Sequence, residues 1–277
     1  MAHGSFIRGL ETTATFDSQT DQFVLNSPTI SSTKWWPGAL AHTSTHAIVM
    51  AQLYIEGKHH GLHGFIVPLR SLKDHSPLPG VEVGDIGPKF GFEMVDNGFL
   101  RLKNVRVPRE NMLMKYAQVD RNGRFSKSVH DKLGYGAMVF VRATIVQDSS
   151  RFIARATTVA VRYSAVRKQF PAQDNPGAPE VQTLDYQTQQ EKLLPYVAAS
   201  FASHFMGLEM MKLYRMNNEL LRQNDTSLLA ELHGMTSGMK ALLTEIACES
   251  MEVCRKSMGG HGYSKFCGGM CLILFCF

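Results

Sequence analysis

The spacing of the hydrophobic residues changes near Gly136, and this change divides the chain into two regions. Before it, short apolar runs alternate with polar residues at period two, which is typical of half-buried strands. After it, apolar residues recur every three or four positions, as they do in amphipathic helices. We therefore expect a multi-domain α+β protein with a β-domain over residues 1–118, a linker over 119–135, a helical domain over 136–266 and an atypical apolar tail over 267–277.

The β-region contains short apolar runs separated by turn-forming residues. The predicted strands cover residues 12–16, 22–25, 47–55, 64–69, 81–83 and 99–107. The polar segment 17–21 predicts a hairpin between the first two strands, and residues 56–61 divide the next two. Strands at this spacing, with no helix between them, predict a small barrel or sandwich.

The helical region contains three long amphipathic segments. The first helix is predicted from Gly136 to Val166, the second over residues 185–223 and the third over residues 228–257. Pro195 either kinks the second helix or marks its true start. The predicted apolar face of this helix comprises Leu193, Val197, Phe201, Phe205, Leu208, Met211 and Tyr214. Three such helices form most of an antiparallel bundle, which usually has a fourth, so we expect the bundle to be incomplete.

Composition excludes several classes of function. The net charge of +5 is modest and the basic residues are scattered, which disfavours nucleic acid as a partner. The five cysteines have no framework spacing, which predicts a reducing compartment without disulfides. The histidines and carboxylates show no metal-ligand spacing. The apolar tail is much shorter than the roughly 20 residues that span a bilayer, so no membrane span is expected.

Each of four polar or glycine-rich motifs allows two interpretations. Lys34-Trp-Trp-Pro-Gly38 is either core packing with a turn or a flat wall against a planar heterocycle. Gly259-Gly-His-Gly-Tyr263 is either a helix stop or a place where backbone amides approach a phosphate. The cations from Arg162 to Lys168 either stabilise a helix C-terminus or hold a pyrophosphate. The amides after Asp185 either cap the second helix or contact a ring or ribose.

Taken together, these motifs resemble one family. The matching segments are Gly9-Leu-Glu-Thr-Thr-Ala-Thr15, Lys34-Trp-Trp-Pro-Gly38, Pro77-Leu-Pro-Gly80, Gly84-Asp-Ile-Gly87, Asp96-Asn-Gly98, Val107-Pro-Arg-Glu-Asn-Met-Leu-Met114, Arg162-Tyr-Ser-Ala-Val-Arg167, Gln187-Thr-Gln-Gln190 and Gly259-Gly-His-Gly-Tyr263. With them, residues 1–266 resemble the peroxisomal acyl-CoA oxidases, relatives of the acyl-CoA dehydrogenases. The resemblance implies an acyl-CoA dehydrogenase-like middle β-barrel domain and a C-terminal helical bundle, which hold FAD between them and across a homodimer. It also implies oxidation of an acyl-CoA to a trans-2-enoyl-CoA in the peroxisome, with O2 reduced to hydrogen peroxide.

The resemblance implies roles for individual residues of this chain. It assigns contacts with FAD to Gly4, Ser5, Gly38, Arg167, Gln187, Gln190, Gly259, Gly260 and Gly262, and it places Tyr135 and Arg142 near the acyl-CoA. The family's catalytic glutamate lies in a segment beyond the position of Tyr263, and no carboxylate of this chain matches it. Family members often finish with a Ser-Lys-Leu-type peroxisomal signal, whereas this chain ends Phe-Cys-Phe277. The alternative interpretation is therefore a non-catalytic truncated form that acts as a dimerisation or interaction module.

Overall fold

The computed structural model describes residues 6–89, 91, 93–127, 136–171 and 177–267, and it divides the chain into two compact units, Met1–Gly134 and Tyr135–Phe277. Residues 268–277 of the expected tail (267–277) lie outside the described residues, as do Gly4, Ser5 and Tyr135. Among the described helices, none is both long and apolar enough to cross a bilayer. The expected change from strands to helices near Gly136 is confirmed, because the first long helix begins at that residue.

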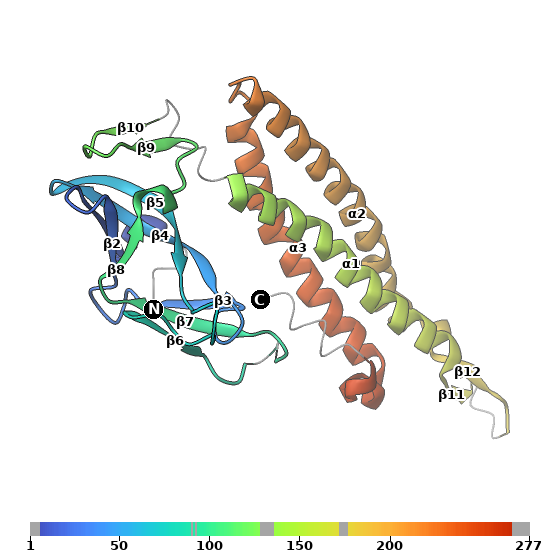
Figure 1. Ribbon diagram of the computed structural model, residues 1–277. Coiled ribbons are helices and arrows are strands. Elements are labelled where there is room, and N and C mark those ends of the chain that lie inside the picture. The colour runs from blue at the N-terminus through green and yellow to red at the C-terminus, as the bar shows by residue number, and fades with distance from the viewer. Residues whose placement is uncertain (1–5, 90, 92, 128–135, 172–176, 268–277) are drawn as a thin grey trace. The chain divides into compact units, whose positions relative to one another are not determined.

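The first unit contains two sheets that share one hydrophobic core (Figure 1). The five-stranded sheet has the order β5(Lys58–Pro68), β4(His46–Ile55), β1(Thr13–Asp17), β2(Gln22–Asn26) and β8(Val105–Pro108). The three-stranded sheet has the order β3(Lys34–Gly38), β7(Asn97–Leu102) and β6(Val81–Asp85). Phe23 and Phe65 from the larger sheet and Leu100 from the smaller one are all buried in this core. The described strands form a sandwich rather than a closed barrel.

Three predictions for this unit need correction. Residues 99–107 are not one strand, because the chain turns at Asn104 (φ 51°) and passes from β7 in one sheet to β8 in the other. The turn between β4 and β5 contains only Glu56 and Gly57, both at positive φ, as tight two-residue hairpins require. The hairpin of β9(Ala117–Val119) and β10(Phe125–Lys127) begins at the end of the predicted β-domain and continues into the predicted linker, so the first unit extends further than expected. The hairpin between β1 and β2 is confirmed.

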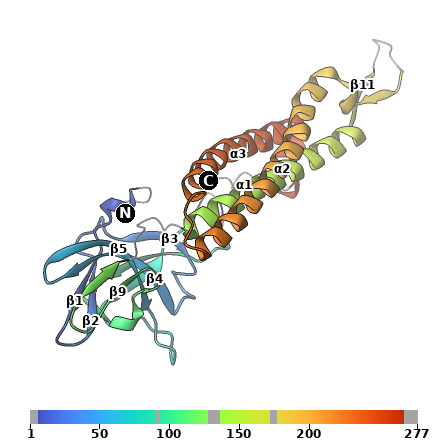
Figure 2. The same cartoon turned by 90° about the horizontal axis from the view of Figure 1, so that it is seen from above.

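The second unit consists of three long helices, α1(Gly136–Val166), α2(Gln187–Arg222) and α3(Leu229–Ser257). The helix α1 packs against both of the others, as Figure 1 shows. The hairpin of β11(Lys168–Pro171) and β12(Glu180–Gln182) connects α1 to α2 and lies at the end of these helices (Figure 2). The helix α2 begins eight residues before Pro195, so the proline does not mark its start.

The predicted apolar face of α2 is only partly the one that packs inward. Leu193 is buried and Met211 and Tyr214 pack against the core, whereas Phe201, Phe205 and Leu208 are exposed. The buried residues of the helix are Leu193, Ser200, Ser203, Gly207, Met210 and Asn217. Small side chains bring α2 very close to α1, since a Cβ atom added to Gly207 would lie 2.9 Å from the Cα atom of Gln147. Close approach of the two backbones at Gly207 therefore adds to the burial of Leu193 and Met210 in holding α2.

Candidate functional site

A groove lies at the end of the helical unit, where α1 ends, α2 begins and α3 ends. Its volume is about 440 Å³. Its lining comprises Tyr163, Arg167, Gln169, Phe170, Thr183, Tyr186, Thr188, Gln189, Lys192, Lys256, Ser257, Met258, Gly259, Gly260 and His261. We call it the glycine-turn groove, after η5(Gly259–Tyr263). The groove brings together three predicted residues that are far apart in the sequence. Arg167 directly follows α1, and Gly259 and Gly260 lie in the turn after α3.

The charge of this groove is positive. Arg167, Lys192 and Lys256 line it, and no carboxylate does. Lys256 Nζ lies 3.1 Å from Glu252 Oε1, outside the lining, and the same carboxylate accepts two hydrogen bonds from Arg255. The Arg255 guanidinium lowers the pKa of Glu252 to about 2, so this carboxylate stays ionised at neutral pH. The remaining positive charge suits an anionic ligand with phosphate-like oxygens.

The three glycines of the turn have different physical roles. Gly259 has a φ of 59°, a conformation that glycine adopts without steric strain. Gly262 is buried, and a Cβ atom there would lie 1.8 Å from the carbonyl oxygen of Arg255, so no other residue fits. Gly260 is exposed, and a Cβ atom there would meet nothing within 4 Å. Gly262 therefore builds the turn, while Gly260 leaves its backbone accessible from the groove.

A hydrogen bond of 3.1 Å between Tyr163 Oη and His261 Nδ1 holds the turn against α1. On the other side of the groove, the backbone N–H of Thr183 donates to the carbonyl of Arg167 at 2.8 Å, and Thr183 Oγ1 donates to the carbonyl of Ser164. Tyr186 Oη donates to the carbonyl of Gln169 at 2.7 Å. These bonds anchor the segment after α1 and so position the backbone of Arg167.

Two glutamines at the start of α2, Gln187 and Gln190, do not line this groove, and their expected contacts with FAD remain predictions. Gln190 does not line the groove, and its amide donates to the carbonyl of Leu184 at 3.0 Å. Gln187 is exposed and does not line it either. The residue that does is Gln189, which sequence reasoning did not select. A signal for it existed, because Gln189 precedes the buried Leu193 by four positions and therefore lies on the same face of α2.

In the first unit, the tandem tryptophans are not core residues. Trp35 and Trp36 are 37% and 56% exposed, so the interpretation as core packing is wrong. Trp35 stacks on Phe99 with ring centroids 5.8 Å apart and an interplanar angle of 17°. The nearest atom to a Cβ atom added at Gly38 is Val95 Cγ1 at 3.8 Å, an ordinary contact. The end of β3 therefore presents an exposed aromatic surface with an accessible backbone beside it.

Arg142 has a partner inside the helical unit. Its guanidinium donates to Ser237 Oγ at 3.0 Å and thereby joins α1 to α3. Twenty-five residues separate Arg142 from Arg167, which corresponds to about 37 Å along a helix. Arg142 therefore does not belong to the glycine-turn groove, and its expected place near an acyl-CoA remains a prediction.

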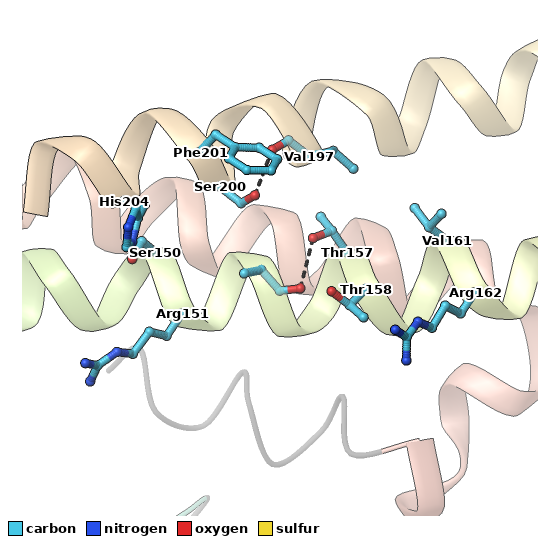
Figure 3. A pocket seen from close by; sticks show the side chains of 11 residues that line it. Ser150, Arg151, Thr157, Thr158, Val161, Arg162, Val197, Ser200, Phe201 and His204 are labelled. Atoms are coloured by element: carbon cyan, nitrogen blue, oxygen red, sulfur yellow. Dashed lines mark hydrogen bonds between the residues drawn. The ribbon is translucent and has the colours of Figure 1, made fainter.

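A larger groove of about 620 Å³ lies between α1 and α2 (Figure 3). Three of its hydroxyl groups are engaged with the helix backbone, since Ser200 Oγ donates to the carbonyl of Val197 and Thr157 Oγ1 to those of Ile153 and Ala154. Ser150 likewise donates to the carbonyl of Gln147. Polar side chains of Thr158, Arg162 and His204 also line the groove.

One group of potential metal ligands appears among the described residues. Ligand atoms of His42, Asp85 and Asp96 lie within 4.8 Å of one another, which the spacing in the sequence did not reveal. However, Asp96 already accepts hydrogen bonds from the backbone of His42 and from the backbone and hydroxyl of Thr43. These bonds connect the loop after β3 to the segment before β7, so the group has a structural explanation.

Two family models match the chain. The acyl-CoA oxidase C-alpha1 domain matches residues 135–272, and the acyl-CoA dehydrogenase middle domain matches residues 1–105. The chain is 54% identical over 270 residues to peroxisomal acyl-coenzyme A oxidase 1 of Bos taurus and, equally, of Homo sapiens. Each alignment covers 98% of this chain and 40% of the relative. The chain thus spans about two fifths of the length of these relatives.

Solved structures of acyl-CoA oxidases are also similar to this chain. Acyl-CoA oxidase 1 of Arabidopsis thaliana is 47% identical with a TM-score of 0.93, covering 99% of this chain and 43% of that one. Acyl-CoA oxidase-2 of Caenorhabditis elegans, solved with FAD, ascaroside-CoA and ATP, is 43% identical with a TM-score of 0.96. That match covers 99% of this chain and 41% of the other.

Proposed function

Because the chain belongs to the acyl-CoA oxidase family, we propose that it forms part of a flavoenzyme of peroxisomal fatty-acid β-oxidation, active as a homodimer. When bound, FAD supplies the two-electron chemistry that converts an acyl-CoA to a trans-2-enoyl-CoA while O2 is reduced to hydrogen peroxide. The residues of this chain bind and orient that cofactor. We assign the abstraction of the α-proton to none of the described residues, because none of their carboxylates matches the glutamate that the family resemblance gives this role.

The glycine-turn groove is the proposed site for the adenosine diphosphate half of FAD. The observation that carries this assignment is the combination of three cations, no lining carboxylate and a glycine turn with an open backbone at Gly260. Arg167 is the residue that we assign to the diphosphate, because a guanidinium pairs with phosphate oxygens through two parallel hydrogen bonds. Lys192 and Lys256 add positive charge along the same wall.

The exposed surface at the end of β3 is the proposed contact for the flavin ring. Trp35 is held by its stacking on Phe99, which leaves a rigid indole beside an accessible backbone at Gly38. Aromatic faces of this kind pack well against planar heterocycles.

Equilibrium binding of FAD and of ADP to the 277-residue chain tests the groove directly. Arg167→Ala should weaken both ligands about 10- to 100-fold, because a charge-assisted contact is lost. Gly260→Val should weaken them as well, because its side chain enters the groove without disturbing the turn. Riboflavin, which lacks both phosphates and the adenosine, should be insensitive to both changes.

Two variants serve as controls for that experiment. Arg155→Ala removes an exposed arginine of α1 that does not line the groove, and Gly234→Val adds a side chain at another glycine where a Cβ atom meets nothing within 4 Å. Both should bind FAD and ADP as the unchanged chain does. Equal affinities for all five proteins, or no binding of ADP at all, would contradict the assignment.

A further inference from the structure

His261 is the only residue of the stretch 259–262 that has a side chain, because the other three positions are glycine. Its main chain is held on both sides. The buried Gly262 lies against the carbonyl of Arg255, and the backbone N–H of Ser264 donates to the carbonyl of His261 at 3.1 Å. The imidazole of His261 therefore extends from a backbone whose position is fixed by the turn.

The two ring nitrogens of His261 have different surroundings. Nδ1 lies 3.1 Å from Tyr163 Oη, and both side chains line the glycine-turn groove. Nε2 has no hydrogen-bond partner among the residues that the structure describes. The bond to Tyr163 therefore explains one nitrogen of the ring as part of the turn. The other nitrogen remains available to a ligand, because His261 is exposed.

The hydroxyl of Tyr163 selects the tautomer of His261. Within the described part of the chain, Nδ1 of His261 is the only hydrogen-bond acceptor of this hydroxyl. When the hydroxyl donates to Nδ1, the proton of the neutral imidazole lies on Nε2, which then becomes a hydrogen-bond donor. The pair of Tyr163 and His261 therefore offers an N–H group to a ligand that occupies the groove.

The charges around this N–H group favour an anionic acceptor. Arg167 follows α1, Lys192 belongs to α2 and Lys256 to α3, and all three line the groove. No carboxylate lines it, since Glu252 pairs with Arg255 and Lys256 outside the lining. Nε2–H of His261 therefore has no carboxylate of the groove to donate to. Phosphate oxygens are the acceptors that the surrounding cations attract.

From these observations we propose that His261 is a ligand-binding residue of the glycine-turn groove, with Nε2–H donating to an oxygen of a diphosphate, and that Tyr163 is its positioning residue. The inference rests on the assignment of this groove to the adenosine diphosphate half of FAD. It adds to the guanidinium of Arg167 a second, uncharged donor from a separate segment of the chain. The diphosphate is then held both by charge and by a directed hydrogen bond.

Two substitutions of His261 separate its two nitrogens in a calorimetric titration of the 277-residue chain with ADP. His261→Asn keeps an acceptor for Tyr163 at the place of Nδ1 and has no atom at the place of Nε2, so it should weaken ADP about 10-fold. His261→Gln keeps an N–H donor near the place of Nε2 and should stay within about 3-fold of the unchanged chain. Adenosine, which has no phosphate, should bind all three proteins alike. His233→Asn, at an exposed histidine of α3 outside the groove, is the control.

Tyr163→Phe tests the positioning role. Without the hydroxyl the imidazole loses its fixed tautomer, so the affinity for ADP should fall about 3- to 5-fold. In the His261→Asn background the same substitution should change the affinity no further, because the donor that Tyr163 positions is already absent. A purely structural effect of Tyr163 on the turn would weaken ADP equally in both backgrounds and would overturn this role. Tyr214→Phe, at a tyrosine of α2 outside the groove, should have no effect.

Arg167→Ala distinguishes a failure of this inference from a failure of the proposed site. If Arg167→Ala weakens ADP and His261→Asn does not, the groove binds the diphosphate without His261, and only this inference is overturned. If ADP does not bind, or if neither substitution changes its affinity, the assignment of the groove and this inference are both wrong. A loss with His261→Gln as large as that with His261→Asn would also overturn the inference, because a donor near the place of Nε2 would then make no difference.

Discussion

The side-chain amide of Gln189 donates to the backbone carbonyl of Ser257 at 3.0 Å and to Ser164 Oγ at 2.8 Å. One side chain at the start of α2 thus joins the ends of α1 and α3. Ser164 is fully buried. Gln189→Ala should therefore lower the free energy of unfolding by about 1–3 kcal/mol, since buried partners lose their hydrogen bonds. Urea denaturation measures this change. Gln187→Ala, at an exposed neighbouring glutamine, should have an effect below about 0.5 kcal/mol.

Replacing Gly262 should disrupt the glycine turn. A methyl group there would overlap the carbonyl oxygen of Arg255, so Gly262→Ala should destabilise the helical unit by about 2–4 kcal/mol. Gly260→Ala is the matched control, because its added methyl group meets nothing within 4 Å. Thermal unfolding of the two variants separates them. Equal melting temperatures would show that the turn relaxes without cost.

The stability at acidic pH should depend on Glu252. The hydrogen bonds from Arg255 lower the pKa of Glu252 from 4.5 to about 2 in the folded chain. A carboxyl group whose pKa falls on folding contributes stability above its unfolded pKa and loses it as the pH falls through the folded pKa. The contribution is therefore full above about pH 4.5 and disappears towards pH 2. Glu252→Gln should remove it, by at most about 1 kcal/mol because the side chain is partly exposed.

The measurement for Glu252 is urea denaturation between about pH 2 and pH 6. Glu245→Gln on the same helix serves as the control, since Glu245 is exposed. The Glu252→Gln curve should be flatter than those of the unchanged chain and the control. A variant with an unchanged pH dependence would show that the ion pair with Arg255 does not contribute.

Lys34 should make the first unit more stable at alkaline pH than at neutral pH. Across the sheet Lys34 pairs with the buried Leu100, so its side chain lies on the core face, and its Nζ atom has no hydrogen-bond partner. Burial lowers the pKa of Lys34 from 10.5 to about 8. Between these values the unfolded chain binds more protons than the folded one, so stability rises with pH from about 8 to about 10.5.

Lys34→Met keeps the length of the side chain and removes the charge. It should raise the free energy of unfolding at pH 7 by about 1–3 kcal/mol and abolish the rise above about pH 8. Lys58→Met, at an exposed position of β5, is the control and should do neither. Denaturation of all three proteins from about pH 7 to pH 10 provides the comparison. If Lys34→Met instead lowers the free energy of unfolding at neutral pH, the ammonium group of Lys34 has a favourable partner in the folded chain.

The helices were easier to predict from the sequence than their packing. The bounds of α1, α2 and α3 lie within two residues of the expected ones, because amphipathic patterns of 29 residues or more are unambiguous. The face of α2 was predicted correctly at Leu193, Met211 and Tyr214 but not at its centre, because hydropathy does not distinguish an apolar residue that is buried in its own unit from one that is exposed. Phe201 and Phe205 belong to the second kind.

For the strands and the candidate groove, too, the sequence pattern did not predict which residues the tertiary structure brings together. Residues 99–107 alternate like one strand, and only the positive φ of Asn104 separates them into two sheets. Arg167, Gly259 and Gly260 were expected at one site because of the family resemblance, and they do line one groove. Gln189 was missed because its neighbours are also glutamines. Its role depends on Ser164 and Ser257, which only the tertiary structure brings near it.

The contact of Gly207 with α1 has a consequence for the exposed side of α2. A Cβ atom at position 207 would lie 2.9 Å from the Cα atom of Gln147, so a larger residue there would push α2 away from α1. The exposed side chains on the far side of the helix would move with it. A substitution at position 207 should therefore shift the outer face of α2, even though it touches no part of that face.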